Sequence, residues 1–207
     1  MAVARNRWRM SEDAQRQPGL IGPNAILQLL PVLEQAGGAD FRDRVMAAAG
    51  LFAPPSDAGM MPEAPAARMH QALRDLEPEL APSLAWEAGV RTGRYIMRYR
   101  IPAPAVRILK LLPAAISGPL LSRAIAKHAW TFAGSGRFSV AGPLAFEIAD
   151  NPIVRGEASE TPLCHWHRAV FETLFATLVD PRLRCIETAC CATGDSVCRF
   201  ELVRDPA

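Results

Sequence analysis

The chain closes on the stretch Cys190-Cys191-Ala192-Thr193-Gly194-Asp195-Ser196-Val197-Cys198-Arg199-Phe200. Its Gly-Asp pair predicts a turn that folds the flanking segments back on each other and brings Cys190 near Cys198. Cys164 and Glu187 add a third thiol and a carboxylate in a chain that has only five cysteines. Zinc takes four such ligands tetrahedrally, and a site filled by four protein groups is normally structural. We therefore predict a structural zinc site here and expect any other chemistry elsewhere.

The spacing of these residues resembles a known signature. Three pieces carry it: Cys164-His165, Glu187-x-x-Cys190 and Gly194-Asp195-x-x-Cys198-x-Phe200. Together they are similar to the pattern of the 4-vinyl reductase domain family, and more distantly to the core subunits of the TRAPP vesicle-tethering complex. From about residue 21 to residue 203 the chain also resembles the small bacteriochlorophyll-biosynthesis members known as 4-vinyl protochlorophyllide reductases. The resemblance implies that the metal ligands are Cys164, Glu187, Cys190 and Cys198.

Two features complicate this site. On a regular strand Glu187 and Cys190 would point to opposite faces, so the chain must turn or bulge between them. Many family members have a glycine soon after the Cys-His pair, whereas His167 and Arg168 follow it here, which predicts a different local turn.

Other interpretations of the cysteines stay open. Buried free cysteines often act as small hydrophobic residues rather than as ligands. Cys185 is predicted to be such a core residue. Substitute ligands would be Cys191, His165 and His167.

Hydrophobic periodicity and the positions of Pro and Gly predict an α+β fold. Helices are expected at residues 24–35, 40–49, 62–76, 83–99, 104–112 and 117–131. Strands are expected at residues 137–141, 144–149, 182–188 and 197–203, with a helix at residues 164–178. This order predicts N-terminal helices followed by a four-stranded antiparallel sheet with a helix between the strand pairs, resembling the TRAPP core-subunit and ligand-binding fold. Residues 1–18 are expected to be a flexible basic arm, and residues 19–207 a single ligand-binding domain.

The charge is distributed unevenly along the chain. The net charge is only +2, yet the 59 residues from Ala88 to Phe146 hold nine Arg or Lys and no Asp or Glu. The remainder therefore carries a net charge of −7. Such a split indicates an anionic ligand, an acidic partner or a membrane surface, with a plain solvated basic face as the alternative.

A tetrapyrrole with propionate groups would fit the acid-free segment. Arg91, Arg94 and Arg98 would bind the carboxylates, because the guanidinium fork suits them. Trp130 would stack on the ring, and His128 would be an axial ligand of a central magnesium ion. A surface or core-edge role is the alternative for His128. Gly89 and Gly93, four residues apart, predict either a close helix crossing or a flat ligand on the backbone.

A reductase would need a nicotinamide, flavin or iron–sulfur source of electrons. The only glycine-rich stretch, Gly134-Ser135-Gly136, lacks the third glycine of a dinucleotide loop and is expected to follow a helix rather than a strand. The cysteines also lack iron–sulfur spacing. Whether the protein is an enzyme stays uncertain, and the residues favour a non-enzymatic role.

These observations favour a tetrapyrrole-binding carrier or accessory protein of bacteriochlorophyll biosynthesis that presents a chlorophyll precursor to biosynthetic enzymes. The alternatives are a 4-vinyl reductase acting on divinyl protochlorophyllide and an assembly factor for a magnesium-chelatase-type complex. The expected partners are a magnesium tetrapyrrole or porphyrin, a magnesium-chelatase or methyltransferase protein and a second copy of the chain, paired through the N-terminal helices. No nucleic acid is expected, because no DNA-binding motif occurs. With no export signal, a cytoplasmic location is expected, with peripheral contact at the inner membrane as an option.

Overall fold

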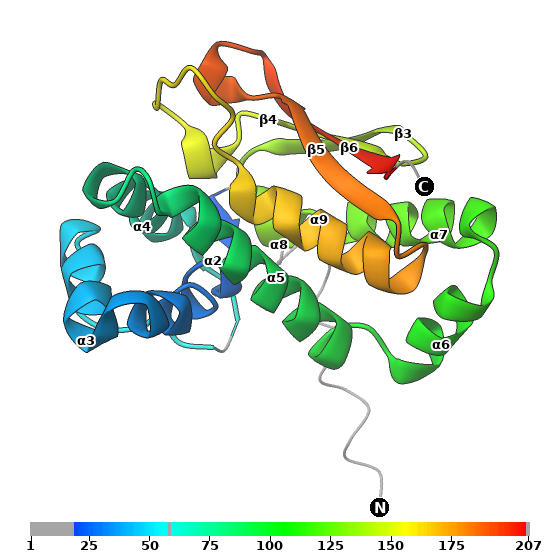
Figure 1. The fold of residues 1–207 in the computed structure, drawn as a ribbon, viewed down its shortest axis with the longest axis horizontal. Helices are drawn as coiled ribbons and strands as arrows, with labels where there is room; N and C mark the ends of the chain where they lie inside the picture. The colour runs from blue at the N-terminus through cyan, green and yellow to red at the C-terminus, as the bar shows by residue number, and fades with distance from the viewer. Residues whose placement is uncertain (1–18, 58, 206–207) are drawn as a thin grey trace, which may run out of the picture.

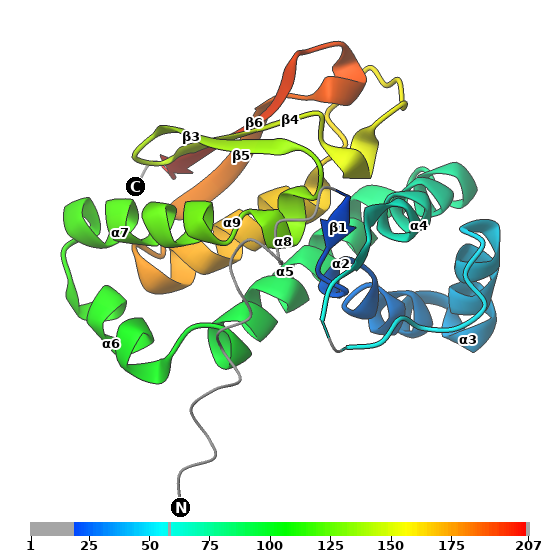
Figure 2. The ribbon, with the colours of Figure 1, turned by 180° about the vertical axis from the view of Figure 1, so that it is seen from behind.

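The computed structural model describes residues 19–57 and 59–205, so the predicted arm at residues 1–18 lies outside the described residues. The first part of the described chain is helical, apart from the short antiparallel pair β1 (Leu20–Ile21) and β2 (Met61–Pro62). Figures 1 and 2 show the helices gathered on one side of a sheet. These helices are α2 (Asn24–Leu27), α3 (Leu30–Ala48), α4 (Glu63–Leu76), α5 (Ala81–Tyr99), α6 (Ala103–Leu111), α7 (Ala114–Lys127) and α8 (Trp130–Ala133).

The second part forms the four-stranded antiparallel sheet that the sequence predicts. Its strands lie in the order β3-β4-β6-β5, so two hairpins join through the pairing of β4 with β6. The predicted helix between the strand pairs is α9 (His165–Leu178). The strands are β3 (Arg137–Gly142), β4 (Ala145–Ala149), β5 (Leu183–Ala189) and β6 (Val197–Arg204), with short 3-10 turns at η1 (Pro152–Val154) and η2 (Cys191–Thr193).

One face of this sheet is buried. Side chains alternate along β4 and β6, which puts Phe146, Ile148 and Phe200 in the core and their neighbours outside. Helix α9 covers this face, because Phe171 places its ring 5.0 Å from that of Phe146 and 5.2 Å from that of Phe200. The predicted α+β class is confirmed.

Helix α5 packs against α9 on the side away from the sheet (Figure 1). A Cβ atom on Gly89 would lie 2.4 Å from the Trp166 carbonyl oxygen, and one on Gly93 would lie 2.8 Å from the Thr173 Cβ. The two glycines therefore serve a close helix crossing. Of the two roles predicted for them, the structure shows this one.

Two predicted helices have different bounds. The helix expected at residues 24–35 is divided into α2 and α3, because Pro31 begins a new helix near its N-terminus. Gly37 and Gly38 do leave the helical conformation, as predicted, although α3 continues beyond them. The helix expected at residues 117–131 begins at Ala114, because Pro119 lies in its second turn and removes only its own N–H from the helix. None of the described helices is long and apolar enough to cross a membrane.

Candidate metal centre

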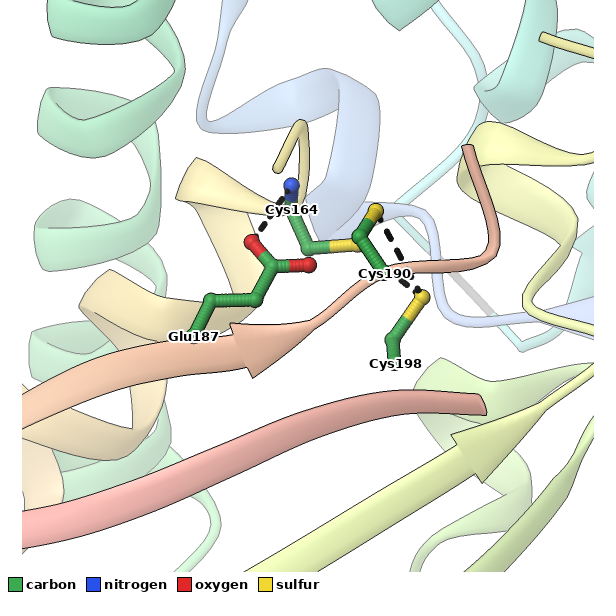
Figure 3. A group of neighbouring side chains, drawn as sticks. All are labelled: Cys164, Glu187, Cys190 and Cys198. Carbon is green, nitrogen blue, oxygen red and sulfur yellow. Dashed lines mark hydrogen bonds between the residues drawn. The ribbon is translucent and has the colours of Figure 1, made fainter. Parts of the chain in front are cut away.

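The structure brings together the four residues predicted as metal ligands. The three Sγ atoms of Cys164, Cys190 and Cys198 and a carboxylate oxygen of Glu187 all lie within 4.8 Å of one another. They come from the start of α9, the end of β5 and the start of β6, and Figure 3 shows them converging on one point. The three cysteines are buried.

A β-bulge resolves the geometric conflict between Glu187 and Cys190. Glu187 pairs with Phe200, whereas Ala189 pairs with the very next residue of β6, Arg199, so Thr188 is an extra residue in β5. The extra residue shifts the alternation of side chains by one position. Glu187 and Cys190 can therefore both face the buried side of the sheet, where Phe200 also lies.

Glu187 is held from one side only. Its Oε2 accepts a hydrogen bond of 2.9 Å from the backbone N–H of Cys164, the residue that precedes α9 (Figure 3). Its Oε1 is buried and has no hydrogen-bond partner among the described residues. Because a buried polar atom without a partner is costly, this oxygen is available to a bound cation.

The distances between the sulfur atoms match tetrahedral coordination. Cys164 Sγ lies 3.4 Å from Cys198 Sγ and 3.9 Å from Cys190 Sγ, and the latter two are 3.9 Å apart. A tetrahedron with metal–sulfur bonds of about 2.3 Å has edges of about 3.8 Å. Three thiols and a carboxylate in this arrangement can hold a single tetrahedral metal ion without a change of backbone.

The electrostatics of the cluster also favour a cation. Burial raises the pKa of Cys164 well above its ordinary value and raises the pKa of Glu187 to about 8. Hydrogen bonds from the thiols of Cys164 and Cys198 instead hold the pKa of Cys190 well below its ordinary value. Without a metal, the buried site thus concentrates its negative charge on one thiolate. A divalent cation would allow the other ligands to ionise as well.

Asn151 supports the cluster from outside the ligand set. Its buried Nδ2 lies 3.3 Å from Cys164 Sγ and 3.5 Å from Cys198 Sγ, in position to donate to either sulfur. The backbone N–H of Cys191 donates to Cys198 Sγ at 3.4 Å. Such N–H donors stabilise thiolate ligands and orient them. Sequence reasoning missed Asn151, and its only signal was a position just after the second predicted strand.

The substitute ligands lie outside the cluster. His167 is buried in the aromatic core between Phe132 and Phe200, and burial lowers its pKa to about 4. Cys191 is half-buried, with its Sγ 4.0 Å from the Ile148 carbonyl oxygen. Cys185 is buried in β5 opposite Leu202, as its predicted core role requires.

The residues predicted to bind a tetrapyrrole lie on two parts of the helical layer. Arg91, Arg94 and Arg98 follow one another along α5, with Arg91 half-buried and the other two exposed. His128 ends α7 and is exposed, and Trp130 begins α8 and is half-buried. The predicted pocket stays a prediction.

A cleft of about 240 Å³ opens beside the metal cluster, where Leu163 and His165 flank Cys164. Its other walls come from α4 and α5, including His70 and Ala85, and none of the predicted tetrapyrrole ligands lines it. It is smaller than the roughly 300–1,000 Å³ of typical ligand pockets.

The glycine-rich stretch has a structural role. The backbone N–H and hydroxyl of Ser135 donate to the Glu63 carboxylate at 2.7 and 2.6 Å, and Arg155 donates to the same carboxylate at 3.0 Å. Gly134 has a φ of 56°, which suits glycine, and the stretch follows α8 rather than a strand. It therefore ties α4 to the start of β3.

Comparison with known proteins agrees with this architecture. The model of the 4-vinyl reductase domain matches residues 144–204, which contain all four clustered residues. Among solved structures, the chain is similar to an H-NOX protein from a study of heme distortion (TM-score 0.54, 10% identity, covering 90% of this chain and 97% of that one) and to an H-NOX mutant from K. algicida (TM-score 0.52, 9% identity, 90% and 97%). These matches support the α+β fold but are not TRAPP subunits, so the resemblance to TRAPP stays a prediction.

Two relatives cover most of the chain. The bacteriochlorophyll synthase 23 kDa chain of Cereibacter sphaeroides is 57% identical over 88% of this chain and 90% of its own length. The protein of the same name from Rhodobacter capsulatus is 50% identical over 88% of this chain and 86% of its own length. The chain therefore belongs to the family of these small bacteriochlorophyll-pathway proteins with a 4-vinyl reductase domain.

Proposed function

We propose that the protein binds a tetrapyrrole intermediate of bacteriochlorophyll biosynthesis and presents it to a biosynthetic enzyme. The observation that carries this is the 57% identity to a protein named as one chain of bacteriochlorophyll synthase. A chain of such an enzyme works beside other chains, which supports an enzyme partner. A fold neighbour is described by its heme, which is itself a tetrapyrrole, so the fold is compatible with this class of ligand.

The basic face of α5 is the proposed carboxylate-binding site. Arg91, Arg94 and Arg98 are spaced at about one turn of the helix and can meet propionate groups at one edge of a disc. Trp130 is the proposed stacking residue, and His128 the proposed axial ligand. Because the cleft beside the metal cluster is small, the disc would lie on the helical surface or in a pocket that opens on binding.

An absorbance titration tests this function. Purified protein is titrated with a magnesium porphyrin, and binding is expected to shift the Soret band. Arg91→Ala and Arg94→Ala are expected to weaken binding, whereas Arg44→Ala, an exposed arginine on α3, serves as the matched control. An unshifted band would rule out the carrier role. Unchanged affinity for the propionate ester would rule out the arginines as carboxylate partners. Turnover of a vinyl group with added reductant would instead establish the reductase alternative.

We propose that zinc occupies the cluster of Cys164, Glu187, Cys190 and Cys198 and has a structural role. The supporting observations are the donor set, the sulfur spacing and the unpartnered Glu187 Oε1. Because metal binding is linked to folding, Cys198→Ala is expected to destabilise the protein more than Cys185→Ala, which truncates a buried cysteine outside the cluster. Elemental analysis is expected to find one zinc per chain. Metal-free protein, purified without chelator, would contradict the proposal.

A further inference from the structure

Exposed apolar side chains gather where α5, α6 and α7 meet. In the part of the chain that the structure describes, five of the eleven exposed large hydrophobic side chains fall within residues 99–120. Leu111 is the most exposed of the five, at 84%. We call this set the corner surface; its apolar members are Tyr99, Ile108, Leu111, Ile116 and Leu120.

Helix α6 is the centre of the corner surface. It has no buried residue, although Val106 and Leu109 pack partly against the core. Figures 1 and 2 show α6 at the outer edge of the molecule, where the chain turns from α5 to α7. Pro102 and Pro113 immediately precede α6 and α7, and both have extended backbone conformations that set this turn.

The same surface is positively charged. Basic residues alternate with the apolar ones, and no acidic residue occurs between Ala88 and Phe146. Exposed aliphatic side chains beside Lys and Arg are typical of helices that lie in the interface of an anionic bilayer. The exposed basic residues of the corner surface are Arg98, Arg100, Arg107, Lys110, Arg123 and Lys127.

We propose that the corner surface docks the protein on an anionic lipid bilayer, with α6 lying along the headgroups. Charge complementarity selects this occupant. In a symmetric pair, a second copy would bring the same cations face to face, and such like-charge contacts are unfavourable. A bilayer supplies negative headgroups for the basic residues and an apolar layer for Leu111 and Ile108. This docking does not depend on tetrapyrrole binding.

Vesicle flotation of the full chain tests the proposal. The protein is expected to float with vesicles of phosphatidylcholine and phosphatidylglycerol, and much less with phosphatidylcholine alone. Lys110→Ala is expected to weaken binding about fivefold, the amount that corresponds to one interfacial charge. Leu111→Asp is expected to weaken it further, because it places a charge at the most exposed apolar position.

Matched controls test whether flotation depends on the corner surface rather than on exposed apolar side chains in general. Phe52→Ser changes an apolar side chain that is 93% exposed in the loop after α3, and is expected to leave flotation unchanged. The α6 variants should keep the wild-type melting temperature and magnesium-porphyrin affinity, because their side chains are exposed and lie off α5. Equal binding to neutral and anionic vesicles, or wild-type flotation of Leu111→Asp, would overturn the proposal. So would conversion of a dimer to a monomer by Leu111→Asp with no change in flotation.

Discussion

Asn151 shows how one buried amide can control a thiolate cluster. Asn151→Asp keeps the oxygen that accepts from the Ile153 N–H, but replaces the N–H donor near two sulfur atoms with a negative oxygen. We expect metal affinity to fall about 10–100-fold, as is usual when an outer-shell partner is lost. Competition against a chromophoric chelator would measure it. Asn24→Asp changes an asparagine of α2 whose side chain accepts from Gln28, and should leave affinity unchanged. Equal affinities for both variants would contradict a role of Asn151.

Two buried histidines should make the protein sensitive to acid. Burial, with a contribution from Arg74, lowers the pKa of His70 to about 3, and burial lowers that of His167 to about 4, from an ordinary value of 6.5. The unfolded chain therefore binds protons more readily than the folded protein below pH 6.5. Stability is fully present above that pH and is lost as the pH falls, by about 1.4 kcal/mol per pH unit for each histidine.

Urea unfolding between about pH 7 and about pH 5 would measure this slope. His70→Gln can keep a donor for the Ala25 carbonyl oxygen, 3.0 Å from Nε2, but cannot titrate. It should have a shallower slope than the wild type, whereas acid release of the metal affects both proteins alike. Identical slopes for the two proteins would show that His70 does not contribute.

The contact between α5 and α9 has almost no free space. Gly89→Ala would place a Cβ 2.6 Å from the Ala169 Cβ and closer still to backbone, so the helices would have to separate. We expect a loss of about 1–3 kcal/mol in the free energy of unfolding, as is usual for overpacking. Gly118→Ala is the matched control in α7, because its Cβ would lie 3.4 Å from the Leu144 Cδ2. It should be neutral or stabilising by up to about 1 kcal/mol. Equal effects in thermal melts would contradict the close crossing.

The chain as a whole is predicted to form a homodimer through its N-terminal helices. Leu76 at the end of α4 and Leu80 before α5 are both nearly half exposed, and offer an apolar contact away from the basic corner surface. Light scattering should give a dimer mass at tens of micromolar. Leu76→Asp should shift the mass towards the monomer, and Lys110→Ala should not. A monomer mass for the wild type would end the prediction.

Much of this architecture was predictable because it depends on local preferences. Alternating apolar residues in Leu144–Ala149 and Val197–Val203 favour half-buried strands, and β4 and β6 lie there. Gly37 and Gly38 interrupt a helix because glycine readily leaves the helical conformation. The four donor residues could be identified from their types and spacing alone. Pro119 misled the prediction, because a proline early in a helix costs less than one in its middle.

The sequence by itself thus determined the fold class, the strand order along the chain and the identity of the four clustered donors. Only the tertiary structure decided how those donors meet, because the Thr188 bulge depends on pairing with β6 rather than on the preferences of β5. It also decided the partners of Asn151, Gly89 and Gly134, which contact residues far away in the chain. Local propensities act over a few residues, whereas such contacts exist only once distant segments have packed together.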